Sequence, residues 1–437
     1  MTVTVVGGGL AGCEAAWALA ERGAQVTLHE MRPARNTPAH RTDRLAELVC
    51  SNTFKSLESV NAHGLLKAEL RLLGSVLLEA ADAARIPGGA ALTVDREIFA
   101  RHATDRVSAH PRITVVRGEV TTTPSPGIVA TGPLTSDALA GAIATRLGLE
   151  SLAFYDAIAP IVAGDSLELD RLYRASRYGK GGGDDFLNAP FSREEYDAFL
   201  DALVAADQYP GQAFDPIPYF EGCLPVEEMA RRGRETLRFG PLKPVGLPDP
   251  RTGREPWAVV QLRQEDRAGQ MWNLVGFQTR LRTGEQRRVF RTIPGLARAE
   301  FLRTGSVHRN TYLNAPAALT AHLSAPDDPT LLFAGQLVGV EGYTESLATG
   351  LLAGINMALL LDGEAPRIPP PETMLGALLR YLHHAPPAHF QPMNANFGLL
   401  PPLHPPVRDK RRKRELLAER ALTAMRAFAA GVAPVPA

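Results

Sequence analysis

The feature that most constrains this chain is a glycine turn set between a strand and a helix at its amino terminus. An apolar, β-branched run from Thr2 to Val6 leads directly into Gly7-Gly8-Gly9-Leu10-Ala11-Gly12, and small apolar residues at helical spacing continue to Gly23. A second strand, residues 25–29, follows and ends at Glu30. This order predicts a βαβ unit in which glycines let the backbone approach a pyrophosphate, the helix amino terminus faces the phosphates and Glu30 receives ribose hydroxyls. A tight turn without a ligand is the alternative, but the flanking elements and Glu30 favour dinucleotide binding by Gly7, Gly8, Gly9, Leu10, Ala11, Gly12 and Glu30.

Composition sets the class of protein and the compartment. The chain has 437 residues, enough for two or three domains, with 45% hydrophobic and 22% charged residues, which is typical of a soluble globular protein. The formal net charge is zero, so any contact with nucleic acid depends on local basic patches. Three cysteines cannot form a disulfide framework and indicate a reducing compartment. The first apolar stretch carries charged residues and residues 346–361 are too short to span a bilayer, so we predict a cytoplasmic protein without a membrane or DNA partner and without a metal site.

A second strand-glycine-helix pattern lies far down the chain. A buried strand at residues 330–335 leads through a glycine-rich turn into a predicted helix from Tyr343 to Leu361. Because that helix can face the far end of a long cofactor and stabilise negative charge on a reduced isoalloxazine, the pattern favours FAD over NAD. Strand ends that abut a cofactor carry small residues, although ordinary turns do so too. The further cofactor-binding candidates are Val120, Thr131, Gly132, Gly335, Gln336, Glu341 and Gly342.

These two units predict an α/β fold with a discontinuous nucleotide domain. From about Ser151 the sequence changes to short β-like runs rich in Gly, Pro and aromatic residues, with one helix at residues 192–205 that begins with a Ser192/Glu195 capping box. We therefore predict a Rossmann-type, glutathione-reductase-like FAD-binding domain in two parts, residues 1–150 and 301–437. An α+β substrate domain, residues 151–300, is inserted between them.

Two cysteines stand where a thiol could react. Cys50 lies where an apolar segment meets a turn, a setting that fits a poised thiol and also a buried one, and the residues alone favour the buried thiol. Cys223 lies just outside a short predicted helix, with Pro225 at its first position and Gly233 at its end. The helix dipole favours a reactive thiol there, whereas neighbouring glutamates oppose it, so reactive and structural roles both stay open. Cys13, directly after the glycine turn, is predicted to be a packed helix residue.

Two basic clusters are candidates for RNA contact. Arg287 and Arg288 belong to a group of five arginines at residues 280–291, which charge pattern alone more often makes a solvated face. Residues 408–414 hold six basic residues in seven and precede a predicted helix from Glu415 to Ala430. This block is the best local candidate for an RNA footprint, with a flexible solvated end as the alternative. Its candidate residues are Lys410, Arg411, Arg412 and Lys413.

Six segments together resemble the folate- and FAD-dependent tRNA (uracil-5-)-methyltransferase family, and the resemblance spans nearly the entire chain. They are residues 5–16, 47–52 (Glu-Leu-Val-Cys-Ser-Asn), 128–136, 178–185 (Tyr-Gly-Lys-Gly-Gly-Gly-Asp-Asp), 334–343 and 391–398 (Gln-Pro-Met-Asn-Ala-Asn-Phe-Gly). The resemblance implies transfer of a one-carbon unit from 5,10-methylenetetrahydrofolate to C5 of uridine 54 in the tRNA T loop, with NAD(P)H reducing FAD. It also implies that His308 stacks on the folate pteridine.

The implied chemistry gives both reactive cysteines a role. Uracil C5 is a poor nucleophile until a thiolate adds at C6, and we assign that addition to Cys223. Cys50 would lie near the flavin and handle the methylene carrier or act as an acid-base group. The rival interpretations are a GidA-type flavoprotein that modifies the wobble uridine, a flavin-disulfide reductase, which the absence of a C-x-x-C pair disfavours, and a non-catalytic flavin-binding RNA chaperone.

Overall fold

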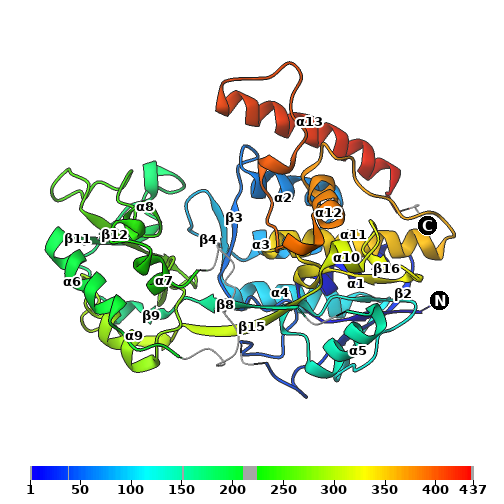
Figure 1. Cartoon of the computed structure of the whole chain (residues 1–437), viewed down its shortest axis with the longest axis horizontal. Coiled ribbons are helices and arrows are strands. Elements are labelled where there is room, and N and C mark those ends of the chain that lie inside the picture. Colours follow the sequence, from blue (N-terminus) through cyan, green and yellow to red (C-terminus); the bar gives the residue numbers. More distant parts are fainter. Residues whose placement is uncertain (1, 38, 150–151, 210–223, 435–437) are drawn as a thin grey trace.

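A computed structural model gives the structure of the chain and describes residues 2–37, 39–149, 152–209 and 224–434. Figure 1 shows a larger α/β part, which contains both ends of the chain, and a smaller part beside it. The two are joined by a two-stranded antiparallel ribbon of β8 (Leu152–Ile158) and β15 (Ser306–Tyr312), in which His308 lies opposite Asp156.

The larger part is built on a six-stranded sheet with the order β16-β17-β7-β1-β2-β6. The four pairings from β17 to β6 are parallel, and β17, from the second half of the chain, pairs with β7 from the first, with Leu331 opposite Gly127. The predicted α/β fold with a discontinuous nucleotide-binding sheet is therefore confirmed. The strands are β1 (Thr2–Val6), β2 (Gln25–Glu30), β6 (Ile113–Arg117), β7 (Gly127–Val129), β16 (Ser324–Ala325) and β17 (Asp328–Phe333).

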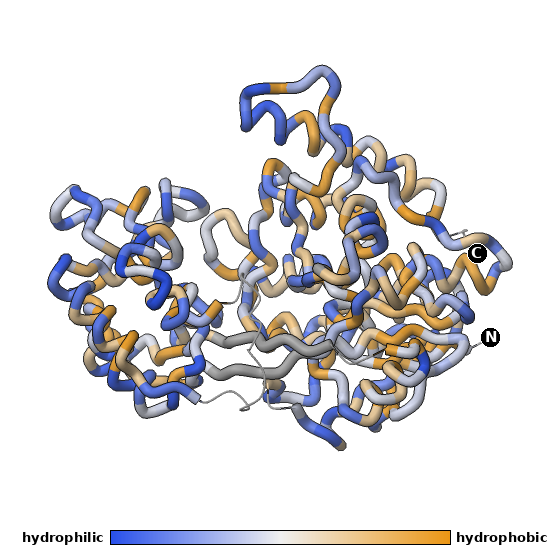
Figure 2. Tube along the Cα trace, in the orientation of Figure 1, coloured by the Kyte–Doolittle hydropathy of each residue, from blue (hydrophilic) through white to orange (hydrophobic). Residues whose placement is uncertain are grey.

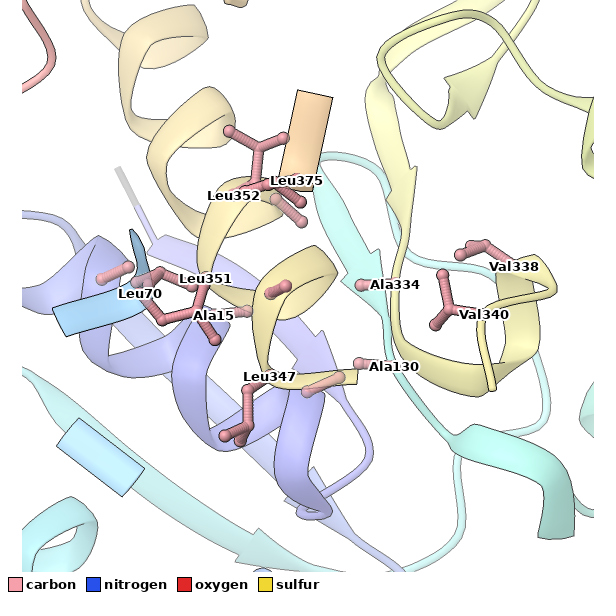
Figure 3. Close-up of a cluster of buried hydrophobic side chains, with 14 of the residues drawn as sticks. Ala15, Leu70, Ala130, Ala334, Val338, Val340, Leu347, Leu351, Leu352 and Leu375 are labelled. Atoms are coloured by element: carbon pink, nitrogen blue, oxygen red, sulfur yellow. The ribbon is translucent and has the colours of Figure 1, made fainter. Parts of the chain in front are cut away.

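Two helices of small residues pack closely over this sheet. α1 (Leu10–Glu21) crosses α11 (Tyr343–Leu361) so tightly that a Cβ on Gly350 would lie 2.2 Å from the Ala11 carbonyl oxygen. Figure 3 shows the apolar side chains around this contact, with Ala15 of α1 beside Leu347 and Leu351 of α11. Among the described residues, α11 is the one helix that is long and apolar enough to cross a membrane by length and composition. Of its most apolar 18-residue stretch, 83% is buried inside the protein.

Further helices and a small sheet complete the larger part. Two helices lie one after the other at residues 62–72 and 76–83, and Gly74, with a left-handed φ of +82°, separates them. α13 begins at Lys410 and not at Glu415, since the Asp409 side chain accepts the Arg412 N–H and caps the helix there. The remaining elements are α2 (Ala62–Leu72), α3 (Val76–Ala83), α4 (Arg96–Ala109), α5 (Asp137–Leu147), α10 (Ala315–Ala318), α12 (Met374–His384), α13 (Lys410–Gly431), β3 (Thr53–Ser56), β4 (Arg85–Ile86) and β5 (Ala91–Val94).

The smaller part has its own sheet and its own core. Its six strands have the order β10-β11-β12-β13-β9-β14, and the described pairings are antiparallel. The core is aromatic, with Phe191, Phe199, Phe277 and Phe290 fully buried. The predicted capping box is present, because Ser192 and Glu195 exchange side-chain to backbone hydrogen bonds at the start of α6. The elements are β9 (Ile161–Ala163), β10 (Tyr173–Arg174), β11 (Phe186–Phe191), β12 (Ala258–Gln264), β13 (Met271–Leu274), β14 (Phe301–Arg303), α6 (Arg193–Val204), α7 (Val226–Arg231), α8 (Thr236–Phe239) and α9 (Thr283–Phe290).

Candidate active site

The glycine turn forms an open cradle at the end of β1. Gly7 has a φ of +107°, and a Cβ on Gly12 would lie 1.8 Å from the Gly7 carbonyl oxygen, so both positions need glycine. A Cβ on Gly9, by contrast, would meet no protein atom within 4 Å, which leaves that backbone open to a ligand. No side chain caps the amino terminus of α1, where Leu10 and Ala11 lie. These features fit the pyrophosphate of a dinucleotide.

Glu30 closes the cradle and is held in place by the protein. One carboxylate oxygen accepts the Gly8 N–H at 3.1 Å, and the other accepts the Arg32 N–H and Nε, each at 2.9 Å. Burial works against ionisation of this carboxyl, but the Arg32 guanidinium outweighs it and holds the Glu30 pKa below its ordinary value. Glu30 lines a cavity together with the glycine turn, Val120 and Thr131. The carboxylate predicted for the ribose therefore also anchors the glycine turn.

The second strand-glycine-helix unit meets the first. A Cβ on Gly335 would lie 2.8 Å from the Ala11 Cβ, so this turn packs against the start of α1. Gln336 donates to Glu341 at 2.7 Å, and Gly342, with a φ of +121°, precedes α11 without a side-chain cap. Gly132 begins the 3₁₀ turn after β7. The two glycine turns, from opposite ends of the sequence, thus meet at the start of α1.

The Cys50 segment lies beside the amino terminus of α11. The Tyr343 hydroxyl oxygen accepts the backbone N–H groups of Cys50 and Ser51, at 2.9 and 3.0 Å, and its proton is donated to the Ser51 carbonyl. Cys50 itself is partly exposed, so the buried thiol that the residues alone favoured is wrong. One phenol therefore holds the backbone N–H groups of Cys50 and of the residue that follows it.

Arg96 contacts the same segment through the segment's backbone carbonyl groups. It donates to the carbonyl of Leu48 at 2.8 Å and to that of Cys50 at 3.4 Å, and its Nε pairs at 2.6 Å with Glu265, the residue that follows β12. Glu265 is 2% exposed. The ion pair therefore connects the cysteine segment of the larger part to the sheet of the smaller part.

Two arginines of the smaller part also contact this segment. Arg303 donates to the Val49 carbonyl at 2.8 Å, and Arg263 donates to the Asn52 side-chain oxygen at 2.7 Å. The Asn52 amide in turn donates to the carbonyls of Val94 and Gln264. The segment that carries Cys50 is thus held by side chains from both parts of the molecule.

A buried acidic group lies at the start of α11. Glu345 accepts His63 Nδ1 at 3.1 Å and the N–H of Ala395, in the predicted 391–398 motif, at 2.8 Å. Burial opposes ionisation of Glu345, but its hydrogen bonds and the nearby Lys55 outweigh it and lower its pKa. Burial also lowers the pKa of Lys67 to about 7, and its ammonium donates to the Phe54 and His63 carbonyls.

The other predicted residues are placed as follows. Cys13 is fully buried, with its sulfur 3.4 Å from the Gly8 carbonyl oxygen, and burial raises its pKa, which confirms a packed helix residue. Cys223 lies outside the described residues. Pro225 is the residue before α7 and not its first residue. His308 lies on β15, in the ribbon between the two parts.

The basic candidates do not form one surface. Arg287 and Arg288 are exposed on α9 of the smaller part, where Arg288 pairs with Glu285 at 2.6 Å. The four residues of the basic block are exposed in the first turn of α13, and both Arg411 and Arg412 pair with Glu415. Figure 1 places α9 and α13 at opposite sides of the molecule, and in Figure 2 the end of α13 nearest the smaller part is hydrophilic.

Several site residues could not be identified from the sequence. Tyr343, Arg96, Arg263 and Arg303 converge on one segment from elements far apart in the chain, and no local pattern marks them. Glu345 could have been suspected, since a carboxylate in the first turn of a long apolar helix is well placed for a ligand or a partner. Among the described residues, no group of three or more His, Cys, Asp or Glu residues could hold a metal ion.

The fold and the cradle define an α/β protein of the FAD-binding class. The family model described as glucose inhibited division protein A matches residues 2–365. Two solved structures of Aquifex aeolicus GidA cover the whole chain with a TM-score of 0.71, at 16% and 17% identity and with 74% and 76% of their own length covered. These structures show the shared fold.

Curated relatives define the family more narrowly. A protein of Geobacter sulfurreducens is 60% identical over 422 residues, which covers 96% of this chain and 97% of the relative. A protein of Desulforudis audaxviator is 56% identical over 430 residues, 98% of each chain. Both are named methylenetetrahydrofolate--tRNA-(uracil-5-)-methyltransferase TrmFO. The present chain belongs to this TrmFO family.

Proposed function

We propose that this chain transfers the one-carbon unit of 5,10-methylenetetrahydrofolate to C5 of uridine 54 in the tRNA T loop, which yields 5-methyluridine and tetrahydrofolate. The observation that carries this function is identity of 54–60% to the first three relatives of that name, over at least 96% of the chain. A GidA-type modification of the wobble uridine is disfavoured, because the GidA structures share only 16–17% identity with this chain.

The reaction needs a reductant as well as a carbon donor. The methylene unit is more oxidised than a methyl group by two electrons, and tetrahydrofolate is released without being oxidised. The two electrons therefore come from a third molecule, which we take to be NAD(P)H. FAD, when bound, supplies the two-electron chemistry that links them. Gly7 to Gly12 and the start of α1 would hold its pyrophosphate and Glu30 its ribose, while Gly335, Gln336, Glu341 and Gly342 would line its far end, with Val120, Thr131 and Gly132 beside the cradle.

The two thiols divide the remaining chemistry. We assign to Cys223 the addition to uracil C6, which makes C5 nucleophilic, and to Cys50 the handling of the one-carbon unit or of a proton beside the flavin. The clamp of Tyr343 and Arg96 on the Cys50 backbone supports a role that needs exact placement. If Cys223→Ala still forms a covalent complex with uridine-containing RNA and Cys50→Ala does not, the two roles are reversed.

The folate and the tRNA are each assigned to particular residues of the chain. We place the pteridine against His308 and the tRNA backbone against Arg287, Arg288, Lys410, Arg411, Arg412 and Lys413, in the cytoplasm. The target base must leave its folded loop, which costs a few kcal/mol, and phosphate contacts offset that cost. tRNA binding should therefore weaken as salt rises, and binding that is insensitive to salt would exclude these contacts.

The test is methyl transfer from labelled methylenetetrahydrofolate, with NAD(P)H, to unmodified tRNA. We expect label in wild-type tRNA and none in the same tRNA with cytidine at position 54. Label that survives the uridine-to-cytidine change would place the target elsewhere, and binding without transfer would indicate an RNA chaperone.

A further inference from the structure

Lys55, in the strand that follows the Cys50 segment, has a strained backbone conformation. It lies in β3, five residues after Cys50, and has a left-handed φ of +63°. Glycine and asparagine adopt that conformation readily, whereas lysine does so rarely. The pairing of β3 with β5 shifts register between Thr53 and Ser56, so Lys55 lies in a β-bulge. Bulges beside active sites redirect a side chain, and we therefore asked what the side chain of Lys55 meets.

Side chains of α2 and α11 hold the bulge in place. Lys67, which is 2% exposed, donates to the Phe54 carbonyl at 2.7 Å, and the Thr344 hydroxyl donates to the same carbonyl at 3.4 Å. The Phe54 ring is buried and packs against Tyr343, with 5.6 Å between the ring centroids. The backbone before Lys55 is therefore fixed, and the strain at Lys55 persists because its surroundings impose it.

The side chain of Lys55 is exposed and makes no hydrogen bond or ion pair with the described residues. Two nearby carboxylates already have other partners, because Glu58 pairs with Lys180 and Glu345 pairs with His63, each at 3.1 Å. Burial raises the pKa of Glu345, and His63 together with Lys55 outweighs that effect, so the Lys55 charge lies near the start of α11. A fixed backbone thus presents a cation that suits an anionic ligand.

The position of β3 suits contact with a long polyanion. In Figure 1, β3 lies between α9 and α13, on the side of the larger part that faces the smaller part. α9 carries Arg287 and Arg288, and α13 begins with the basic residues 410–413. A target base that leaves its loop to reach the Cys50 segment brings the phosphates on either side of it to the same place. Lys55 is a cation at that place.

We propose that Lys55 binds a backbone phosphate of the tRNA next to the target uridine, an inference that rests on the proposed function. The lysine ammonium is a compact charge that pairs with phosphate from many directions, so it can hold an extruded nucleotide without the exact geometry that an arginine fork needs. Asparagine or glycine would relieve the backbone strain at this position, but neither would supply the charge.

Two other groups in the proposed reaction also carry negative charge. They are a reduced flavin and the carboxylates of the folate, and either could pair with a lysine ammonium. The binding of a phosphate in a polyanion differs from both in its dependence on salt, because each phosphate contact releases counterions from the nucleic acid. The experiment therefore measures tRNA binding against salt and compares it with folate affinity and with the reduction potential of the flavin.

The test uses three substitutions of Lys55 and one control, all in the FAD-loaded enzyme. Lys55→Asn and Lys55→Gly remove the charge and suit a left-handed backbone, whereas Lys55→Arg keeps the charge. Lys243→Asn is the control, because Lys243 is an exposed lysine of the smaller part whose ammonium also has no partner in the described structure. Thermal unfolding reports the fold of each variant, and binding of unmodified tRNA is measured from about 50 to 200 mM salt.

We expect Lys55→Asn and Lys55→Gly to unfold at or above the wild-type temperature and to bind tRNA about tenfold more weakly, with a salt slope smaller by about one. Their KM for tRNA should rise about tenfold, while kcat and the KM for methylenetetrahydrofolate change less than about twofold. Lys55→Arg should keep most of the affinity for tRNA, and the control should behave as the wild type does.

An unchanged salt slope, an equal loss in the control, or a Lys55→Arg variant as weak as Lys55→Asn would overturn the proposal. Lower unfolding temperatures for both neutral variants would make Lys55 a structural residue. Unchanged tRNA binding with a shifted flavin potential or a weaker folate affinity would assign the charge to one of those groups instead. Methyl transfer by the wild-type preparation is recorded in parallel, so failure of the proposed function is seen separately.

Discussion

The dinucleotide end and the thiol end of this molecule are built in opposite ways. The cradle for the dinucleotide comes mainly from one stretch, residues 7–30, in which glycines remove atoms so that backbones can approach. The Cys50 segment is held by side chains from α4, β12, β14 and α11 that add hydrogen bonds to a short loop. The first site should fail when an atom is added, and the second when a polar group is removed.

The hydrophobic cores of the larger and the smaller part differ in the same way. Close packing of α1 on α11 depends on Gly350 and Gly354, whose absent Cβ atoms would lie 2.2 and 2.5 Å from carbonyl oxygens of α1. The smaller part instead fills its interior with large aromatic side chains. The core of the larger part fixes a cofactor-binding backbone. The core of the smaller part fixes β12 and β14, whose arginines contact the Cys50 segment.

The largest effect is expected at the glycine turn. Gly12→Ala would place a Cβ 1.8 Å from the Gly7 carbonyl oxygen, so the turn cannot keep its shape. We expect purified protein with less than about a tenth of the wild-type flavin, which is at least 1.4 kcal/mol of lost binding, and no methyl transfer. Absorbance of the purified protein measures this, and Gly141→Ala, where a Cβ meets nothing within 4 Å, should keep its flavin.

The next effect concerns the clamp. Arg96→Met leaves Glu265 buried without its 2.6 Å partner, which costs about 3–5 kcal/mol at the contact between the two parts. Flavin content should stay near that of the wild type, while methyl transfer falls at least about 100-fold. A variant that loses flavin as completely as Gly12→Ala does would show that the two ends are not separable.

A third prediction tests the dinucleotide end through pH. Glu14 of α1 is fully buried; one oxygen accepts the Leu77 N–H and the Ser75 hydroxyl, and the other has no partner in the described structure. Burial raises the pKa of Glu14 to about 7. Because the folded-state pKa is raised, this group's contribution to stability is complete below the unfolded value, near 4.5, and is lost as pH rises through 7, a change of about 3 kcal/mol.

Glu14→Gln removes that titration while keeping the oxygen that accepts both hydrogen bonds. Urea unfolding at pH 5 and pH 8 should therefore show that the variant gains stability relative to the wild type at the higher pH. An equal difference between the two proteins at both pH values would contradict a raised pKa for Glu14.

A smaller effect is expected at Tyr343. Tyr343→Phe leaves the N–H groups of Cys50 and Ser51 without their acceptor, a cost of about 1–3 kcal/mol. We expect retained flavin, methyl transfer reduced about tenfold, and faster alkylation of Cys50 by iodoacetamide because the loop opens more often. Unchanged alkylation would mean that the hydroxyl does not restrain the cysteine.

The smallest effect is expected at the third cysteine. Cys13→Ala removes one buried sulfur and should cost about 1 kcal/mol of stability with full activity, whereas Cys50→Ala should lose activity and keep its fold. Methyl transfer by the two purified variants makes the comparison. A folded but inactive Cys13→Ala would refute the packing role.

Sequence reasoning succeeded where the structure is local. The glycine turn and the Ser192 capping box each carry their signal within a few residues, and both are present. The strand predicted at residues 330–335 is present too, but it spans Asp328–Phe333, since Gly335 already begins the next turn. It did not find the clamp, since Tyr343 lies 293 positions from Cys50 and Arg96 lies 48 from Leu48. α13 begins five residues before the predicted Glu415, because the Asp409 side chain caps a helix that starts within a run of like charges, and such a run by itself indicates a solvated end.

The central claim is that the flavin cradle and the Cys50 segment act together on one tRNA uridine. The direct measurement is mass spectrometry of unmodified tRNA after incubation with the enzyme, NADPH and methylenetetrahydrofolate carrying ¹³C in its methylene group. We predict ¹³C-labelled 5-methyluridine at position 54 and at no other position. Label at the wobble uridine, or an unlabelled methyl group at position 54, would contradict the account.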